Sequence, residues 1–143
     1  MMTEAELDKL GYDEPGKLRY YWEKGELTSS WLETGGCETG GWEDLGMVMT
    51  SDERVVWSGL QQHGSVTVYR GHGPEGPGVE GLSWTLEKTT AEWFARRFFR
   101  AEGTVITATV DSDAVIAYLD GRNEKEVVLD PYYSKTIVSV ETV

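Results

Sequence analysis

Two glutamates near the end of the chain, Glu124 and Glu126, are separated by one residue and precede the apolar run Val127–Leu129. On a β-strand, residues i and i+2 share a face, so the spacing predicts that the two carboxylates point into the same space. Like charges on one face repel unless a cation, a proton or a substrate lies between them. The pair is therefore a candidate site in which one carboxylate binds and the other catalyses. The structural alternative is a charged edge strand, since charges on an edge prevent aggregation.

A second candidate is Arg70, at the end of the segment Val66–Gly71. The alternation of β-branched and aromatic residues there predicts a strand. Gly71 follows directly and begins a glycine- and proline-rich stretch that runs through Gly78. An arginine at a strand end can bind a phosphate or carboxylate with its planar guanidinium. The structural alternative is an ordinary surface salt bridge.

A third candidate is the pair of hydroxyls on Ser83 and Thr85, within the predicted strand 82–85. Their i, i+2 spacing places both hydroxyls on one face of that strand. Thr89 or Thr90 is the expected N-cap of the helix that follows. The structural alternative is a strand-to-helix turn in which the two hydroxyls have no special role.

Taken in order, Tyr-Arg-Gly at Arg70, Ser-x-Thr from Ser83 and Glu-x-Glu from Glu124 resemble the arginine–serine–glutamate signature of mono-ADP-ribosyltransferases. That family includes clostridial binary toxins and vertebrate arginine-specific ecto-enzymes. The resemblance covers roughly residues 45–143, and we recognise no motif in residues 1–44. It implies an α+β fold whose core is a split, two-sheet NAD-binding structure, with NAD consumed as a substrate.

The resemblance also implies roles for the residues of the first two motifs. Arg70 corresponds to the arginine that contacts the phosphate and ribose of NAD, and Gly71 to the position whose backbone holds the nicotinamide carboxamide. Ser83 corresponds to the serine that orients the catalytic glutamate and touches the nicotinamide ribose. Thr85 matches the last position of the serine motif, and the resemblance implies that it also contacts the cofactor. Trp84 replaces its usual middle threonine and is expected to contact the cofactor.

For the third motif, the resemblance makes Glu126 the catalytic glutamate and Glu124 the residue that, when acidic, accompanies arginine as the acceptor. Arg122 and Tyr118 are the expected acceptor contacts from the turn-like segment before the glutamates. For Tyr118 the alternative is a partly buried sheet residue.

The chemistry of this reaction requires such residues. Breaking the nicotinamide–ribose bond develops positive charge on the sugar, as in glycoside cleavage through an oxocarbenium-like transition state. A fixed carboxylate bonded to the ribose 2′-hydroxyl stabilises that charge. A second carboxylate can position a guanidinium through a bidentate pair and assist its deprotonation during attack.

The composition limits the other functions that the chain can have. A balance of 13 basic against 25 acidic residues gives a net charge of −12, which argues against a nucleic-acid-binding surface. One cysteine, Cys37, excludes an internal disulfide framework, and we expect it to have no functional role. Two histidines and one cysteine form no recognisable metal-ligand spacing, so no metal is expected. Neither an apolar spanning segment nor a signal peptide is evident, so we expect no membrane contact and a cytoplasmic location.

The sequence predicts one α+β domain over residues 1–143. Residues 1–44 are expected to form a helical and loop extension, and the resemblance implies that residues 45–143 form a catalytic core. The expected helices are 3–10, 15–24, 50–62 and 89–100, and the expected strands are 66–70, 82–85, 104–110, 114–118, 125–129 and 136–142.

The leading functional hypothesis is an NAD-dependent mono-ADP-ribosyltransferase that modifies a macromolecular acceptor, namely a protein arginine. It would act inside a cell as an effector, either a phage-encoded modifier of host machinery or a bacterial toxin. The first alternative is an NAD glycohydrolase, which transfers ADP-ribose to water. The second is a non-enzymatic acidic protein that blocks a basic surface of a partner, supported by the net charge of −12.

Overall fold

The computed structural model of the chain describes residues 2–23, 42–73, 78, 81–97 and 103–143. Cys37 lies outside these residues. The chain forms two compact units, Met1–Met49 and Thr50–Val143, and each is described by itself. The predicted boundary between extension and core, after residue 44, falls a few residues before this division.

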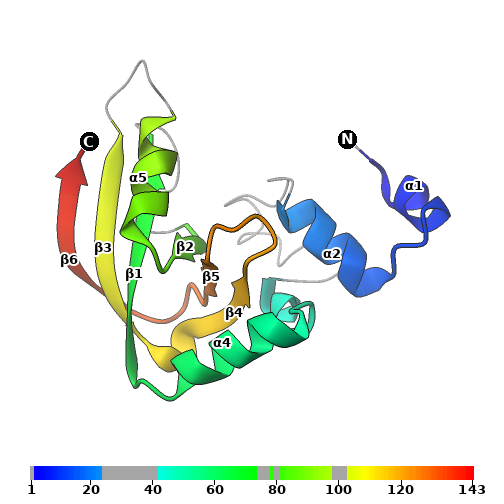
Figure 1. Ribbon diagram of the computed structural model, residues 1–143, viewed down its shortest axis with the longest axis horizontal. Helices are drawn as coiled ribbons and strands as arrows, with labels where there is room; N and C mark the ends of the chain where they lie inside the picture. The colour runs from blue at the N-terminus through cyan, green and yellow to red at the C-terminus, as the bar shows by residue number, and fades with distance from the viewer. Residues whose placement is uncertain (1, 24–41, 74–77, 79–80, 98–102) are drawn as a thin grey trace. The chain divides into compact units, whose positions relative to one another are not determined.

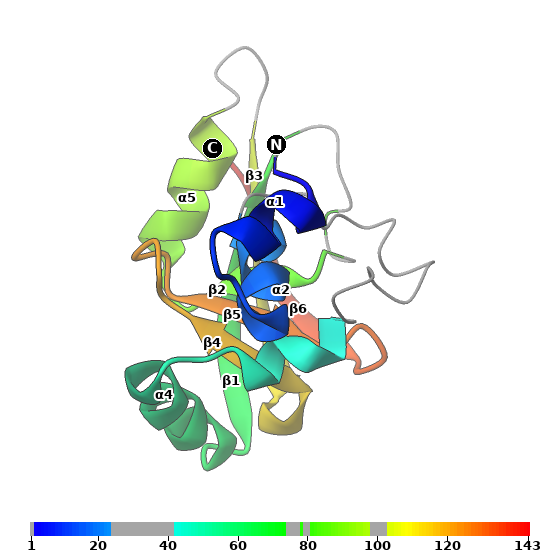
Figure 2. The ribbon, with the colours of Figure 1, turned by 90° about the vertical axis from the view of Figure 1, so that its right-hand side faces the viewer.

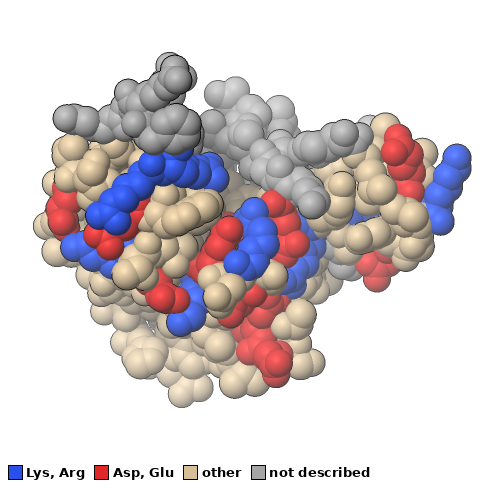
Figure 3. All heavy atoms as spheres, turned by 45° about the horizontal axis from the view of Figure 1, so that its top comes forward, with Lys and Arg blue, Asp and Glu red and all other residues tan. Residues whose placement is uncertain are grey.

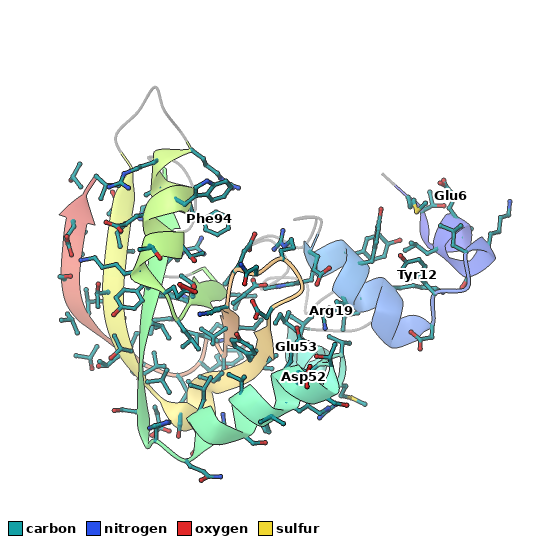
Figure 4. The ribbon with its side chains drawn as sticks, in the orientation of Figure 1. Glu6, Tyr12, Arg19, Asp52, Glu53 and Phe94 are labelled. Carbon is teal, nitrogen blue, oxygen red and sulfur yellow. The ribbon has the colours of Figure 1, made fainter. Side chains whose placement is uncertain are left out.

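The N-terminal unit consists of two short helices and a 3-10 helix: α1 (Glu4–Lys9), α2 (Glu14–Glu23) and η1 (Trp42–Met47). The side chain of Thr3 caps α1 by accepting a hydrogen bond from the backbone N–H of Glu6, which Figure 4 labels. Buried apolar residues from all three elements form its core: Leu7, Leu18, Trp22 and Leu45. None of the candidate site residues lies in this unit.

The C-terminal unit is built on one six-stranded sheet in which every neighbouring pair of strands is antiparallel. Its strand order is β4-β5-β2-β1-β3-β6. The elements of this unit follow in chain order: α4 (Ser51–Gln61), β1 (Ser65–His72), β2 (Ser83–Thr85), α5 (Lys88–Arg96), β3 (Thr104–Asp111), η3 (Ser112–Ala114), β4 (Val115–Leu119), β5 (Glu126–Leu129) and β6 (Lys135–Thr142). The predicted α+β class is confirmed. The expected division into two sheets is replaced by a single open sheet.

The two halves of this sheet are joined at one point. β1 pairs with β3 along its whole length, from Ser65↔Asp111 to His72↔Thr104. β1 pairs with β2 at one residue pair only, Tyr69↔Thr85. Figure 2 shows β4 and β5 running across the direction of β1, as expected for a strongly twisted sheet.

Two helices cover parts of the sheet, as Figure 1 shows: α5 lies along β1 and β3, and α4 packs on β4. A small cluster formed by Ala91, Ala95 and Val105 lies between α5 and β3. Gly71 allows the close approach of α5 to β1, because a Cβ at this position would overlap the Ala91 carbonyl. The larger core is formed by alternate residues of β1 and β3 and by most of β4 and β5: Val66, Val68, Ile106, Ala108, Val110, Val115, Ala117, Leu119, Val127, Val128 and Leu129.

The predicted elements agree with the structure except at several ends. The helix expected at 50–62 is α4, and Thr50 begins it with a capping box in which Glu53 is the reciprocal partner. The N-cap prediction for the next helix was wrong. α5 begins at Lys88, so Thr89 and Thr90 lie inside it, and its N-cap residue makes no side-chain cap hydrogen bond. Of the helices in the described ranges, none is both long and apolar enough to cross a membrane.

Candidate active site

The structure brings Arg70, Ser83 and Glu126 together from three adjacent strands, β1, β2 and β5. The hydroxyl of Ser83 donates a hydrogen bond to Oε2 of Glu126. The backbone carbonyl of the same serine accepts a hydrogen bond from Nη1 of Arg70, with a length of 2.7 Å. Ser83 therefore connects the arginine to the glutamate, one through its backbone and the other through its side chain.

The guanidinium of Arg70 is not a surface ion-pair partner. Its burial lowers the pKa of the group, and the nearby negative charge of Glu126 acts in the opposite direction by raising it. Nε of Arg70 is buried and has no hydrogen-bond partner among the described residues. The structural alternative for Arg70, an ordinary surface salt bridge, does not fit this environment.

Gly81 provides the space for this guanidinium. A Cβ on Gly81 would lie 2.5 Å from Nη2 and 2.6 Å from Nε of Arg70, which is far inside a normal contact distance. Only a residue without a side chain lets the guanidinium lie against the backbone here. This role of Gly81 was not predicted from the sequence. The signal in the sequence was the position of Gly81, which comes directly before the predicted strand 82–85 that carries Ser83.

Glu126 is a buried carboxylate, with 5% of its surface exposed. It is the first residue of β5 and pairs with Thr85 of β2. Burying a carboxylate is costly unless hydrogen bonds and opposite charge compensate for the lost water. Here Ser83 supplies a hydroxyl donor and Arg70 supplies positive charge. The arrangement holds the carboxylate in a fixed orientation.

The prediction that Glu124 and Glu126 share a strand face was wrong, because β5 begins only at Glu126. Lys125, between them, has a left-handed φ of 45°, and Asn123 has a φ of 57°. A left-handed residue interrupts the alternation of a strand, so the i, i+2 rule does not apply across it. Glu124 instead belongs to the loop between β4 and β5, where its Oε2 lies 3.3 Å from Nη2 of Arg122.

This β4–β5 loop, residues 120–125, is fastened to the sheet at its C-terminal end. The hydroxyl of Thr85 donates to the carbonyl of Glu124 at 2.7 Å. The N–H of Lys125 donates to Oδ1 of Asp120 at 3.1 Å, which closes the loop on itself. Nζ of Lys125 also lies 2.8 Å from Oε1 of Glu87. Thr85 is 5% exposed, so its predicted cofactor contact is replaced by this role in holding the loop.

The N-terminal end of the loop is fastened to α4 by Glu53. Oε1 of Glu53 accepts from the N–H of Thr50 at 2.8 Å, completing the capping box. Oε2 of Glu53 accepts from the N–H of Asp120 at 2.6 Å. Figure 4 shows Glu53 and its neighbour Asp52 at the N-terminal end of α4. The Thr50-x-x-Glu53 spacing could have identified the capping box, but nothing local indicates the contact with Asp120.

Tyr118 and Trp84, both expected to contact ligands, are core residues. Tyr118 is 4% exposed, and burial together with its hydrogen bond to Asp120 raises the pKa of Tyr118 to about 12. The structure therefore favours the sheet-residue alternative for this tyrosine. Trp84 is 2% exposed, and its indole N–H donates to the carbonyl of Gly81 at 2.8 Å. A ring buried to this extent has no face left for stacking on a cofactor.

Within the described residues, no group of three or more histidine, cysteine, aspartate or glutamate side chains could hold a metal ion. On the face of the molecule in Figure 3, acidic and basic side chains are interspersed rather than gathered into a basic patch.

No protein-family model, curated protein or solved structure matches the chain.

Proposed function

We propose that this protein is an NAD-dependent mono-ADP-ribosyltransferase whose acceptor is an arginine of another macromolecule. The observation that carries the proposal is the contact chain from Arg70 through Ser83 to Glu126. Three residue types suggested by an ordered sequence pattern meet at one place although they come from three different strands.

Glu126 is the residue that drives cleavage in this proposal. Its buried, oriented carboxylate accepts a hydrogen bond from the ribose 2′-hydroxyl and stabilises the positive charge that develops as the nicotinamide–ribose bond breaks. The hydrogen bond from Ser83 fixes the carboxylate before the substrate binds, so little reorganisation is needed during the reaction.

Arg70 binds the negatively charged part of NAD. Its guanidinium carries the positive charge and the planar set of N–H donors that bind a phosphate, and it lies beside Glu126. The single Tyr69↔Thr85 pair between β1 and β2 also supports the proposal. This single pairing lets β1 and β2 diverge on either side of Tyr69 and Thr85, next to the residues of the contact chain.

Glu124 holds the acceptor. It lies on a loop and is more accessible than the buried Glu126, so it can meet a group that arrives from solvent. Its carboxylate already contacts one guanidinium, that of Arg122, at 3.3 Å. The site is therefore divided into an inner carboxylate for cleavage and an outer carboxylate for a guanidinium.

The test is incubation of the protein with NAD labelled in the adenosine part, in the presence of a cell lysate. Label on a macromolecule supports the transferase, free labelled ADP-ribose alone supports a glycohydrolase, and no turnover supports a non-enzymatic blocking protein. Glu126→Gln should lower turnover by about 10²–10³. Glu92→Gln is the matched control, because Glu92 is on α5 and forms an ion pair with Arg96. Turnover of Glu126→Gln within a few-fold of the control would refute the proposed role.

A further inference from the structure

Glu53 makes a contact that the cap of α4 does not require. Its Oε1 accepts from the N–H of Thr50, which completes the capping box. Its Oε2 accepts from the N–H of Asp120 at 2.6 Å, on a loop 67 positions further along the chain. Glu53 is only 5% exposed, although a carboxylate that caps a helix can do so from water and avoid the cost of burial. The helix cap therefore does not account for the second contact or for the burial of this charge (Figure 4).

Asp120 connects this carboxylate to the whole β4–β5 loop. Its backbone N–H is bound by Glu53, as described above. Its carbonyl accepts from the N–H of Asn123 at 3.1 Å, which makes a tight turn. Its Oδ1 accepts from the N–H of Lys125, also at 3.1 Å. The shape of the loop and its attachment to α4 thus depend on the same residue.

The two carboxylates of the candidate site differ in their dependence on this loop. Glu126 lies in β5, where it pairs with Thr85 of β2 and accepts the hydroxyl hydrogen bond of Ser83. Glu124 lies in the loop itself, and only its backbone carbonyl is bound to the sheet, by the hydroxyl of Thr85. The side chain of Glu124 therefore moves with the loop, whereas that of Glu126 is held independently of it.

We propose that Glu53 is a positioning residue, which acts through Asp120 to hold Glu124 where it meets the acceptor guanidinium. This inference rests on the proposed function. Without Glu53, the loop stays attached at its C-terminal end by Thr85, but its N-terminal end is released from α4. Misplacing a binding group by about 1 Å can slow a reaction by about 10²-fold. The loss falls on transfer to the acceptor and spares cleavage of NAD.

The experiment compares two variants of the full chain, Glu53→Met and Thr50→Ala. Methionine occupies a similar space but has no carboxylate oxygen for either backbone N–H. Thr50→Ala is the matched control, because it removes the capping hydroxyl of the same helix and leaves both oxygens of Glu53 bonded to backbone. Each folded protein is incubated with NAD and a small guanidine compound, and nicotinamide release and guanidine modification are measured in the same samples.

The KM for the guanidine compound should rise about tenfold or more in Glu53→Met. Its KM for NAD and its rate of nicotinamide release without acceptor should match those of the wild type. Thr50→Ala should resemble the wild type in all three quantities. A merely structural role of Glu53 would instead lower nicotinamide release and guanidine modification by the same factor, because both would follow the fraction of folded protein.

Two variants of Asp120 repeat the test at the other end of the contact, including the case in which Glu53→Met does not fold. Asp120→Ala removes the acceptor for the N–H of Lys125, whereas the side-chain oxygen of Asp120→Asn can still accept from it. We expect Asp120→Ala to raise the KM for the guanidine compound and Asp120→Asn to restore it. Amide hydrogen exchange at Lys125 should also be faster in Glu53→Met than in Thr50→Ala, a readout that needs no turnover.

The inference alone is overturned if Glu53→Met and Thr50→Ala have the same KM for the guanidine compound. It is equally overturned if the two activities of Glu53→Met fall in parallel. Absence of nicotinamide release from the wild-type protein would overturn the proposed function together with the inference.

Discussion

Gly81→Ala should displace the guanidinium of Arg70. The new methyl carbon would overlap Cζ and lie 2.5 Å from Nη2, whereas ordinary contacts need about 3.5 Å or more. The guanidinium must therefore move by more than about 1 Å. A movement of this size away from Ser83 lengthens the 2.7 Å hydrogen bond to the Ser83 carbonyl beyond hydrogen-bond range.

The expected loss of stability follows from this broken contact. A hydrogen bond to a charged group contributes about 1.5–3 kcal/mol, and overpacking a buried site costs about 1–3 kcal/mol. The two costs do not add, because the movement that breaks the bond relieves the overlap. We expect the free energy of unfolding to fall by roughly 2 kcal/mol. If Arg70 binds NAD, its displacement should also weaken NAD binding by about 10- to 100-fold.

Urea unfolding and calorimetric titration of NAD measure these two effects. Gly59→Ala is the matched control, since a Cβ on Gly59 in α4 meets nothing within 4 Å. It should be neutral or stabilising by up to about 1 kcal/mol. If the two variants unfold at the same urea concentration and bind NAD equally, the guanidinium is not held against Gly81, and the reasoning is refuted.

Glu124→Gln should lose transfer to an arginine acceptor yet keep appreciable NAD hydrolysis, since cleavage does not need the acceptor to be held; equal loss of both activities, measured in the same samples, would contradict this. Glu53→Gln should destabilise the protein by about 1–3 kcal/mol in urea unfolding, because the two backbone N–H groups bind different oxygens of Glu53 and one of these oxygens becomes an NH2 donor in Gln; the exposed Asp52→Asn should change stability little. Between pH 10 and 12 the folded protein retains the proton of Tyr118 that the unfolded chain loses, so stability should fall as pH rises through this range. In unfolding experiments at a series of pH values, Tyr118→Phe should remove the contribution of Tyr118 to that fall. If the free energy of unfolding of this variant falls with pH as steeply as that of the wild type, the pKa of Tyr118 is not raised.

Local patterns in the sequence were sufficient to predict most of the elements. The alternation in Thr104–Val110 and in Val66–Arg70 predicts strands that the structure contains as β3 and β1. The apolar spacing after residue 50 predicts α4. These predictions succeed because strand and helix periods are short-range properties that can be seen within a few residues. The ordered set of Arg70, Ser83 and Glu126 was also evident from the sequence alone.

The tertiary structure decided which of these side chains meet and how. The contacts that build the site join residues far apart in the chain: Arg70 to Ser83 across 13 positions, Ser83 to Glu126 across 43, and Glu53 to Asp120 across 67. No local period encodes such contacts, because they depend on strand order and register.

The same reason explains the site predictions that the structure changed. A strand pattern predicted that Glu124 and Glu126 share a face, but the left-handed backbone of Lys125 separates them. The family resemblance implied that Thr85 contacts the cofactor, but the chain returns at Glu124, whose carbonyl accepts the hydrogen bond of the Thr85 hydroxyl. The sequence by itself determined the residue types available for the chemistry. The packing of β1, β2 and β5 determined that Glu126 is buried beside Arg70, while the loop leaves Glu124 to face Arg122.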